Sequence, residues 1–567
     1  MHQPRSPLHP SPVRLRLSQL LLLALVAAPA QAAPRLDWLL PSGGQRGATF
    51  RAQVGGQALD QITGVVSTGP GVTARVLPAD VGQDPKTART LEIAVAPDAP
   101  LGRTELRLFD GAGAGNPKFF EVGQFPESME KEPNDSRSQA PRVSLPITLN
   151  GRIGQGADID SCTFALQKGQ EVCIEVHSLR LLGELGNTWL KGYAWIEDAR
   201  GRTLAENDGY YRWDPYLQLV APEDGDYTFA YRDIQYRGNP MGTYRVTIGV
   251  IPHVWSAQPL GLQRGARTEV RLLGANLGSD AVQTIEVPDD APEGLLTRRF
   301  SVNGVWTNPL SFVVSRHPTV MEAEPNDTPA QATPVTVPCE ASGRLEQAGD
   351  RDLFRVDGKK GDRLALEIYG DRLDLPLDSV VTLRKPDGAF LAENDDLRGQ
   401  RDGRGIRDSR LDYALPADGE YLVQVMDADG RGGPGFAYRL SVAPPRPNFR
   451  LQVQNDRPVV RPGGSVTLDL TLERQDNWSG EVQIVAEGLP EGAQAAPLTL
   501  AANQTQGKLV LNCAAGVTHQ AAVLRILGEG SIEGTPQRRL ASTQETYNIQ
   551  GTAYRRDLTG PVLVVGR

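Results

Sequence analysis

Apolar and polar residues alternate along most of this chain, in short runs that are separated by turn residues. The alternation is clear at residues 106–108, 244–246 and 466–472, where every second residue is Leu, Val or Tyr. A two-residue period places successive side chains on opposite faces of an extended chain, as in a half-buried β-strand. Clusters such as Pro462-Gly463-Gly464 end these runs and indicate turns. The pattern predicts an all-β chain built of tandem β-sandwich modules.

Two acidic stretches mark the starts of two copies of a longer module. Glu130-Lys131-Glu132-Pro133-Asn134-Asp135 recurs 192 residues later as Glu322-Ala323-Glu324-Pro325-Asn326-Asp327. The same offset relates Asp158 to Asp350, and Leu204-Ala205-Glu206-Asn207-Asp208 has its counterpart at residues 391–395. Because a solenoid needs three or more stacked repeats, two copies do not predict one.

A smaller module repeats as well, and its second copy is shorter. Residues 98–100 match 290–292 at the offset of 192, whereas Gln45-Arg46-Gly47 matches Gln263-Arg264-Gly265 at an offset of 218, so the second copy has lost 26 residues. We expect this truncated copy to need its neighbours to cover its core. The predicted division is a signal peptide at 1–32, an immunoglobulin-like sandwich at 33–126, a long module at 127–252, a truncated immunoglobulin-like module at 253–318, a second long module at 319–446 and a C-terminal immunoglobulin-like sandwich at 447–567.

The N-terminus has the order of a secretory signal: Arg5, Arg14 and Arg16, then an apolar run at residues 20–28, then Ala30-Gln31-Ala32. The apolar run is shorter than the roughly 18 residues that a membrane anchor needs. No later stretch is long and apolar enough to cross a bilayer. We therefore expect cleavage after Ala32 and an exported protein, either periplasmic or extracellular, without a membrane span once the signal is removed.

The net charge limits the class of partner, and the positions of the cysteines indicate whether disulfides form. The net charge of −9 and the pI near 5.4 argue against nucleic acid or an anionic membrane as a partner, since both select basic surfaces. An exported chain can form disulfides. However, a predicted hairpin over residues 162–176 places Cys162 inward with Phe164, Val172, Ile174 and Val176, and Cys173 on the opposite face. We therefore expect four unpaired cysteines that act as small apolar residues.

The acidic stretches are candidate metal sites, because carboxylate and amide oxygens are the ligands that Ca²⁺ prefers, at six to eight per ion. Each stretch alone supplies too few, and the Asp-x-Asp pair at the mouth of the predicted hairpin is the candidate second half, since alternation places both Asp residues on one face. A polar turn is the alternative, because Pro fixes φ and Asn or Asp caps its own backbone. The candidate ligands are Glu130, Glu132, Asn134, Asp135, Asp158 and Asp160 in the first copy and Glu322, Glu324, Asn326, Asp327, Asp350 and Asp352 in the second.

These motifs together resemble the bacterial pre-peptidase C-terminal (PPC) domain: the Glu-x-Glu-Pro-Asn-Asp opening, a Gly-Arg strand start, Asp-x-Asp, Leu-Ala-Glu-Asn-Asp and an Asp-Gly-x-Tyr ending. The resemblance covers about 127–250 and 319–445. It implies a jelly-roll-like β-sandwich that occurs in secreted peptidases and in other exported proteins. In the related collagen-binding domains an acidic linker of this pattern holds calcium, which implies the same twelve residues as ligands. No aromatic surface for collagen can be mapped, so collagen binding is not implied.

No catalytic constellation is found in the sequence. The histidines outside the signal are isolated, and neither His-x-x-x-His nor Gly-x-Ser-x-Gly occurs. We interpret Asp427-Ala428-Asp429-Gly430 as a hairpin turn rather than a calcium loop, and the aromatic group Tyr210, Tyr211, Trp213 and Tyr216 as packing rather than sugar stacking.

The predicted function is that of a non-enzymatic, calcium-stiffened binding or structural protein. Its partner would be an extracellular polymer, an envelope component or a secreted protein. The alternative is an accessory subunit of a secreted peptidase or another hydrolase system.

Overall fold

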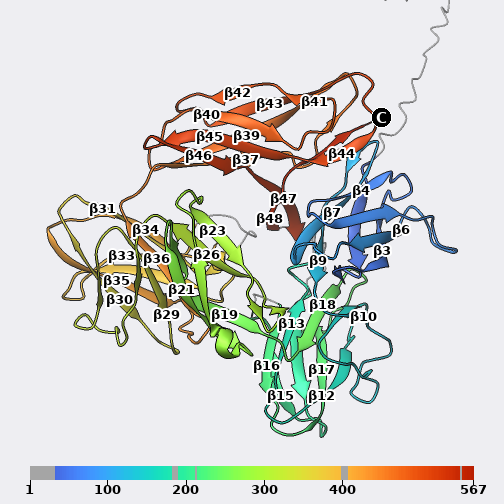
Figure 1. The fold of residues 1–567 in the computed structure, drawn as a ribbon, viewed down its shortest axis with the longest axis horizontal. Coiled ribbons are helices and arrows are strands. Elements are labelled where there is room, and N and C mark those ends of the chain that lie inside the picture. Colours follow the sequence, from blue (N-terminus) through green and yellow to red (C-terminus); the bar gives the residue numbers. More distant parts are fainter. Residues whose placement is uncertain (1–31, 182–189, 211–213, 398–405, 550–551, 567) are drawn as a thin grey trace, which may run out of the picture. The chain divides into compact units, whose positions relative to one another are not determined.

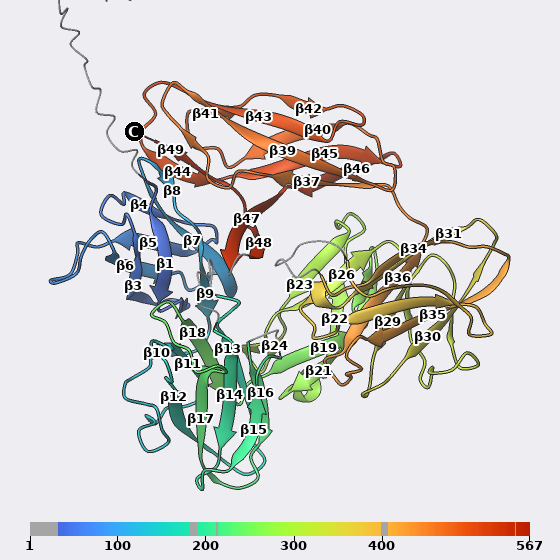
Figure 2. The same ribbon diagram turned by 180° about the vertical axis from the view of Figure 1, so that it is seen from behind.

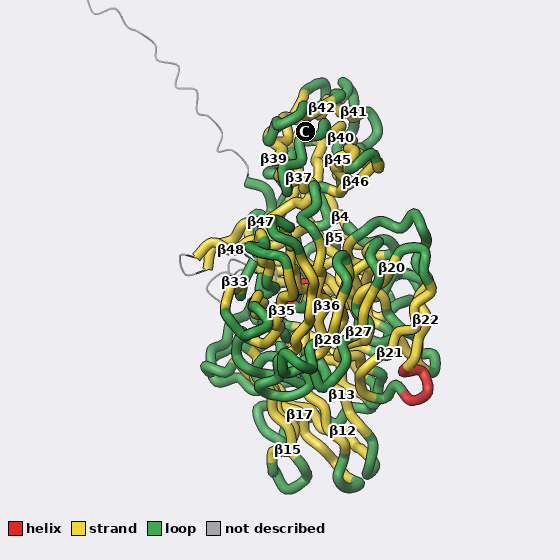
Figure 3. The backbone as a smooth tube through the Cα atoms, turned by 90° about the vertical axis from the view of Figure 1, so that its left-hand side faces the viewer, coloured by secondary structure: helices red, strands yellow, loops and turns green. Residues whose placement is uncertain are grey.

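The structure is a computed structural model that describes residues 32–181, 190–210, 214–397, 406–549 and 552–566. Figures 1 and 2 show that these residues form β-strands almost throughout, and Figure 3, with strands in yellow, shows how little of them is helical. The predicted all-β class is confirmed. Residues 1–31, most of the predicted signal peptide, lie outside the described residues. No helix in the described ranges is long and apolar enough to cross a membrane.

The first stretch forms a sandwich of two sheets, with strand orders β1-β3-β6-β5 and β2-β9-β7-β4. Alternate side chains of β3 and β6, such as Ala52, Val54, Leu91 and Ile93, fill the space between them. The strands are β1 (Arg35–Leu40), β2 (Gly43–Gln45), β3 (Thr49–Gln57), β4 (Gly64–Ser67), β5 (Val72–Val76), β6 (Ala88–Val95), β7 (Gly102–Asp110), β8 (Gly113–Ala114), which pairs with β7, and β9 (Lys118–Gly123).

The first long module has a five-stranded sheet, β10-β11-β18-β13-β16, facing a four-stranded sheet, β12-β17-β14-β15. Its core contains the aromatic residues Phe164, Tyr227, Phe229 and Tyr231. The strands are β10 (Glu127–Met129), β11 (Ile147–Arg152), β12 (Asp160–Leu166), β13 (Glu171–His177), β14 (Gly192–Glu197), β15 (Thr203–Asn207), β16 (Tyr216–Val220), β17 (Gly225–Asp233) and β18 (Thr243–Gly249).

The second long module repeats this topology. Its sheets run β27-β29-β36-β31-β34 and β28-β30-β35-β32-β33, and the short first strand again pairs in parallel with the strand that follows it in the sheet. The elements are β27 (Thr319–Met321), β28 (Thr333–Val335), β29 (Cys339–Arg344), β30 (Asp352–Gly358), β31 (Arg363–Tyr369), the 3-10 helix η2 (Asp371–Leu373), β32 (Ser379–Arg384), β33 (Phe390–Asn394), β34 (Arg410–Ala414), β35 (Gly419–Asp427) and β36 (Ala437–Ala443).

The short module between them has two three-stranded sheets, β19-β21-β22 and β20-β26-β23, and the small hairpin β24-β25. Its core cluster includes Leu373, Leu375 and Ala437 of the second long module, so neighbouring residues do cover it, as expected. The elements are β19 (His253–Gln258), β20 (Gly261–Gln263), β21 (Arg267–Ala275), the 3-10 helix η1 (Gly278–Ala281), β22 (Val282–Glu286), β23 (Gly294–Arg298), β24 (Ser301–Val302), β25 (Val305–Trp306) and β26 (Leu310–Ser315).

The C-terminal stretch contains the sheets β41-β43-β39-β37-β47-β48, β42-β40-β45-β46 and β38-β49-β44 around a large apolar core. The strands are β37 (Asn448–Val453), β38 (Val459–Val460), β39 (Ser465–Gln475), β40 (Val482–Glu487), β41 (Ala493–Ala495), β42 (Leu498–Leu500), β43 (Gln506–Cys513), β44 (Gln520–Val523), β45 (Arg525–Ile532), β46 (Thr535–Leu540), β47 (Ser542–Ile549), β48 (Thr552–Leu558) and β49 (Val562–Val565).

The predicted hairpin over residues 162–176 is wrong. Strand β12 pairs with β17, and β13 pairs with β16 and β18, so the chain crosses from one sheet to the other between them. The predicted inward set still holds, because both strands face the same core, and Cys173 faces away from it. All four cysteines are free and buried, as expected. Alternation determines which face of a strand is buried, but it does not determine which strand is its partner.

Candidate metal site

Each acidic stretch begins where a short parallel strand ends. Strand β10 runs alongside β11, and the Glu130 backbone N–H continues this pairing by donating to the Asn150 carbonyl over 2.9 Å. The Glu130 carboxylate turns back over β11, where Oε1 accepts from the Arg152 backbone N–H over 2.8 Å. A Cβ at Gly151 would collide with Glu130 Oε2 and with the Tyr244 ring, so only glycine lets this carboxylate lie so close to β11.

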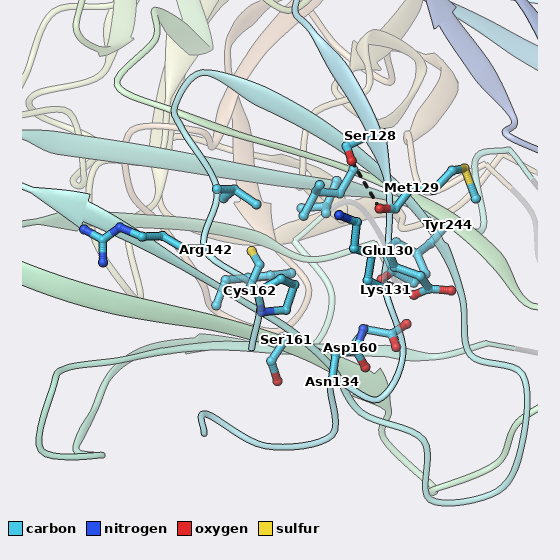
Figure 4. Close-up of a pocket in the computed structure, with 15 residues that line it drawn as sticks. Ser128, Met129, Glu130, Lys131, Asn134, Arg142, Asp160, Ser161, Cys162 and Tyr244 are labelled. Carbon is cyan, nitrogen blue, oxygen red and sulfur yellow. Dashed lines mark hydrogen bonds between the residues drawn. The ribbon is translucent and has the colours of Figure 1, made fainter. Parts of the chain in front are cut away.

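The second half of each site comes from the first residue of β12 or β30. Glu130, Glu132 and Asp160 each place a carboxylate oxygen within 4.8 Å of the others, and so do Glu322, Glu324 and Asp352. Figure 4 shows Glu130, Asn134, Asp160 and Tyr244 side by side where they line a cavity of about 80 Å³. The structure therefore brings together the acidic stretch and one member of the predicted Asp-x-Asp pair, in both copies.

A buried tyrosine that is not among the predicted residues links the two halves. Tyr244 donates to Glu130 Oε2 over 3.0 Å, and its counterpart Tyr438 donates to Asp352 Oδ2 over 2.6 Å. Both phenols are fully buried, and burial raises the pKa of each well above its usual value. The signal was available in the repeat, since Tyr244-Arg245 and Tyr438-Arg439 occupy matching positions on β18 and β36.

The remaining predicted residues hold the loops that carry these carboxylates. Asp158 Oδ2 accepts from the Gly154 backbone N–H over 2.6 Å, and Asp135 Oδ1 accepts from the Ile159 N–H over 3.3 Å. Asn134 is buried, and its amide nitrogen donates to Asp160 Oδ1 over 3.2 Å and to Glu132 Oε2 over 3.1 Å. These three residues lie beside the carboxylate cluster and tie the acidic stretch to the start of β12.

The second copy has the same supporting contacts. Asp350 Oδ2 accepts from the Glu346 backbone N–H over 2.5 Å, and Asp327 Oδ1 accepts from the Arg351 N–H over 3.4 Å. Asn326 is fully buried like its counterpart Asn134. The twelve predicted residues thus divide into six clustered carboxylates and six neighbouring residues, five of which hold the loops through side-chain hydrogen bonds while Asn326 is buried beside its cluster.

Several buried polar atoms of the sites have no hydrogen-bond partner. They are Asp160 Oδ2 in the first copy, and Asp352 Oδ1 with both amide atoms of Asn326 in the second. Asp160 is 2% exposed, and Asp352 and Asn326 are 0% exposed. Because an unpartnered buried polar atom is costly, such atoms directed at one cluster suit a site that binds a cation.

The charges of the clusters are strongly perturbed. Burial raises the pKa of Glu130, and burial together with the Glu130 charge raises the pKa of Asp160 well above its usual value. In the second copy, burial and the Asp352 charge raise the pKa of Glu322 to about 10, and burial raises that of Asp352 to about 7. In the second copy Glu322 therefore retains a proton at neutral pH. In both copies a divalent cation would relieve the repulsion between the buried carboxylates.

The donor set fits a hard divalent cation. Three carboxylates offer up to six oxygens, and Ca²⁺ accepts six to eight oxygen ligands in a flexible geometry. The described clusters contain no cysteine or histidine that would favour a softer metal.

The other sequence motifs have structural roles. Asp427 Oδ1 accepts from the backbone N–H groups of Asp429 and Arg431, so residues 427–430 form a turn, as predicted. Tyr210 and Tyr216 pack against each other, with 5.4 Å between ring centroids, which agrees with the predicted packing role. Tyr211 and Trp213 lie outside the described residues.

Comparison with known proteins places part of the chain in a family. Residues 350–426 match the model of the bacterial pre-peptidase C-terminal domain. A protein named as a probable subtilase-type serine protease, from Deinococcus radiodurans, is 36% identical over 105 residues. That match covers 18% of this chain and 14% of the relative, so the chain spans only a small part of the curated protein that it matches.

Solved structures that align with this chain were also found. The pre-peptidase C-terminal domain of a collagenase from Bacillus anthracis is 15% identical and aligns over 21% of this chain and 99% of its own, with a TM-score of 0.16. Domains 1–6 of the surface layer protein SbsC are 9% identical and align over 95% of this chain and 59% of their own, with a TM-score of 0.13. The family match thus identifies a bacterial pre-peptidase C-terminal domain at residues 350–426 of this chain.

Proposed function

We propose that this chain is an exported, non-catalytic protein whose β-sandwich modules bind an extracellular polymer, an envelope component or a secreted protein. In this proposal Ca²⁺ occupies the two carboxylate clusters and stiffens the start of each long module. The main support is that the same three carboxylates, with the same buried tyrosine, gather in both copies although the copies have otherwise diverged.

Calcium accounts for the sites better than a polar turn does. A turn needs only local hydrogen bonds, such as the one from the Asn134 N–H to Glu132 Oε2 over 3.1 Å. It does not explain why Asp160 and Asp352 are buried beside other carboxylates with oxygens left unpartnered. A bound cation supplies both the missing partner and the missing charge.

The proposed ion would stiffen the chain by joining segments that are distant in sequence. Glu130 directly follows β10, which leads from the preceding module into the first long module, and Asp160 begins β12 in the opposite sheet. An ion between them fixes the entry segment to both sheets of the sandwich. The same holds for Glu322 after β27 and Asp352 in β30.

Calorimetric titration of the full chain with Ca²⁺ tests this proposal. We expect two ions per chain for the unmutated protein, one for Glu132→Ala or Glu324→Ala, and none for the double variant. Excess Ca²⁺ should raise the melting temperature of the unmutated chain, because an ion that binds only the folded state stabilises it by about 2.7 kcal/mol at 100 times its Kd.

The control variant is Glu223→Ala, an exposed acidic residue outside both clusters. It should titrate like the unmutated protein. The proposal is wrong if Ca²⁺ releases or absorbs no heat and leaves the melting temperature of the unmutated protein unchanged.

A second candidate function, as an accessory part of a secreted peptidase system, is supported by the 36% identity to part of a subtilase-type protein. Affinity capture from an envelope extract, with the full chain as bait, separates the two. The accessory role is favoured if a peptidase is captured and if an excess of free chain prevents its capture. The first proposal is favoured if only polymer or envelope material is captured.

A further inference from the structure

The outer face of the four-stranded sheet in the first long module carries a group of aromatic side chains around one arginine. Ala194 and Ile196 of β14 point into the core, so Tyr193 and Trp195 between them lie on the outer face, where both are half-buried. Arg232 lies opposite Tyr193 on β17, and Tyr236 follows in the next turn and is 54% exposed. We refer to Tyr193, Trp195, Arg232 and Tyr236 as the aromatic platform.

The platform is held in place by contacts among its own members. The Arg232 guanidinium lies 3.9 Å from the Tyr236 ring centroid and 4.6 Å from that of Tyr193, and the Tyr193 and Trp195 rings are 5.3 Å apart. Arg232 is anchored by donating to the Asp233 and Ile234 carbonyls over 2.9 and 3.1 Å. Cation–π contacts of this kind orient the rings before any ligand arrives.

Two carboxylates lie at the edge of the platform. The Tyr193 hydroxyl donates to Glu206 over 2.6 Å, and the Trp195 ring N–H donates to Glu197 over 2.8 Å. Each carboxylate can accept further hydrogen bonds, because a carboxylate has about four acceptor positions.

The fold itself does not need this platform. The second long module has the same strands in the same register, with Ala194 and Val381 both opposite an asparagine of the neighbouring strand. At the positions of Tyr193, Trp195, Arg232 and Tyr236 it has Val380, Thr382, Met426 and Gly430. Because the equivalent sheet of the second long module folds without these side chains, folding alone does not explain why the first long module has them.

Tyr236 is also held in an unfavourable backbone conformation. Its φ is +57°, and the equivalent residue of the second long module, Gly430, has a φ of +67°. The two turns have the same hydrogen bond: the Tyr236 N–H donates to the Asp233 carbonyl over 3.0 Å, and the Gly430 N–H donates to the Asp427 carbonyl over 3.0 Å. Glycine adopts this left-handed conformation without steric penalty, whereas a bulky residue does not. This strained conformation lowers the stability of the first long module, and it places the exposed Tyr236 ring over Arg232. Backbone strain of this kind is typical of binding sites.

We propose that the aromatic platform binds a neutral polysaccharide. The exposed ring of Tyr236 and the half-buried rings of Tyr193 and Trp195 offer apolar surface for the C–H faces of sugar rings. The carboxylates at the edge accept hydrogen bonds from sugar hydroxyls. The charges of the platform fit a neutral ligand best. The Arg232 guanidinium already lies against the Tyr193 and Tyr236 rings, where a ligand cation would bind, and its charge would repel a basic peptide. Glu197 and Glu206 would repel a polyanion.

Native affinity electrophoresis of the full chain tests the proposal, with soluble β-1,4-, β-1,3- and α-1,4-linked glucans as probes in the gel. We expect at least one glucan to retard the unmutated chain. Trp195→Thr and Tyr236→Gly, which introduce the residues of the second long module, should each weaken that binding by about tenfold. Tyr236→Gly should leave the melting temperature unchanged or raise it, so a loss of binding cannot be attributed to unfolding.

The matched control is Phe390→Ala, which removes an aromatic ring that is 59% exposed in the second long module. It should be retarded like the unmutated chain. The proposal is overturned if none of the three glucans retards the unmutated chain, if both platform variants bind as well as it does, or if poly-lysine binds the platform in place of the glucans.

Discussion

Individual side chains in this protein show how charge is used where modules meet. His177 of β13 contacts Glu121 of the preceding module through Nδ1, over 2.6 Å, and Glu175 through Nε2, over 2.9 Å. Burial lowers the His177 pKa, but the two carboxylates outweigh burial and raise it to about 9. The imidazole therefore carries a charge at neutral pH and links two carboxylates that would otherwise repel each other.

A pH-dependent contribution of His177 to stability follows. A raised folded-state pKa stabilises the folded protein fully below the ordinary value of 6.5, and the contribution disappears as pH rises through about 9. His177→Gln should lower unfolding stability by about 2 kcal/mol near pH 6.5, with little difference remaining at pH 10. Thermal unfolding of both proteins from pH 6 to 10 measures this, and a gap that stays constant to pH 10 would contradict it.

At the scale of elements, two equivalent aspartates organise the loops after β13 and β31. Asp408 is fully buried, and it accepts from the backbone N–H groups of Gly370 and Asp371 over 2.7 Å each and from that of Arg372 over 3.2 Å. Asp214 does the same for residues 178–180. Neither aspartate could be predicted from local sequence, because each lies 34 to 38 residues from the backbone groups that it binds.

Removal of this carboxylate should strongly destabilise the second long module. Asp408→Ala leaves three buried backbone donors and the Nε–H of Arg372 without their partner, and we expect a loss of about 3–5 kcal/mol. The control Asp412→Ala removes a partly exposed carboxylate that pairs with Arg410 over 3.2 Å, and it should change stability by at most about 1 kcal/mol. Differential scanning calorimetry of the full chain compares them. Equal effects of the two variants would refute the role assigned to Asp408.

At the scale of the whole molecule, the short module depends on its successor. Its core cluster contains Leu373 of η2, Leu375 in the following loop, and Ala437 of β36. The first copy of this small module has four- and five-stranded sheets, whereas the second has two of three strands. The apolar area that the missing strands leave open is covered by residues of the second long module, so residues 253–446 should unfold as one cooperative unit.

Leu375→Ala tests this dependence. Truncation of a buried leucine costs about 2–5 kcal/mol, and here the loss should appear in both the short module and the second long module. Hydrogen exchange of the full chain, measured by mass spectrometry, should show faster exchange across 253–446. Leu217→Ala, in the core of the first long module, is the control and should leave that range unchanged. Faster exchange confined to 319–446 would argue against a shared core.

The sequence alone determined the strand periodicity, the repeat, the inward faces around Cys162 and the stretches that carry the candidate ligands. These are local or strictly periodic properties, which a linear pattern records directly. The module boundaries, the calcium ligands and export stay predictions.

Tertiary structure decided which strands pair, so β12 and β13 lie in different sheets despite their short connection. It also decided that Asp160 rather than Asp158 joins Glu130 and Glu132, and that Tyr244 completes the cluster. Pairing and clustering depend on contacts between distant residues, and alternation carries no information about partners across the core.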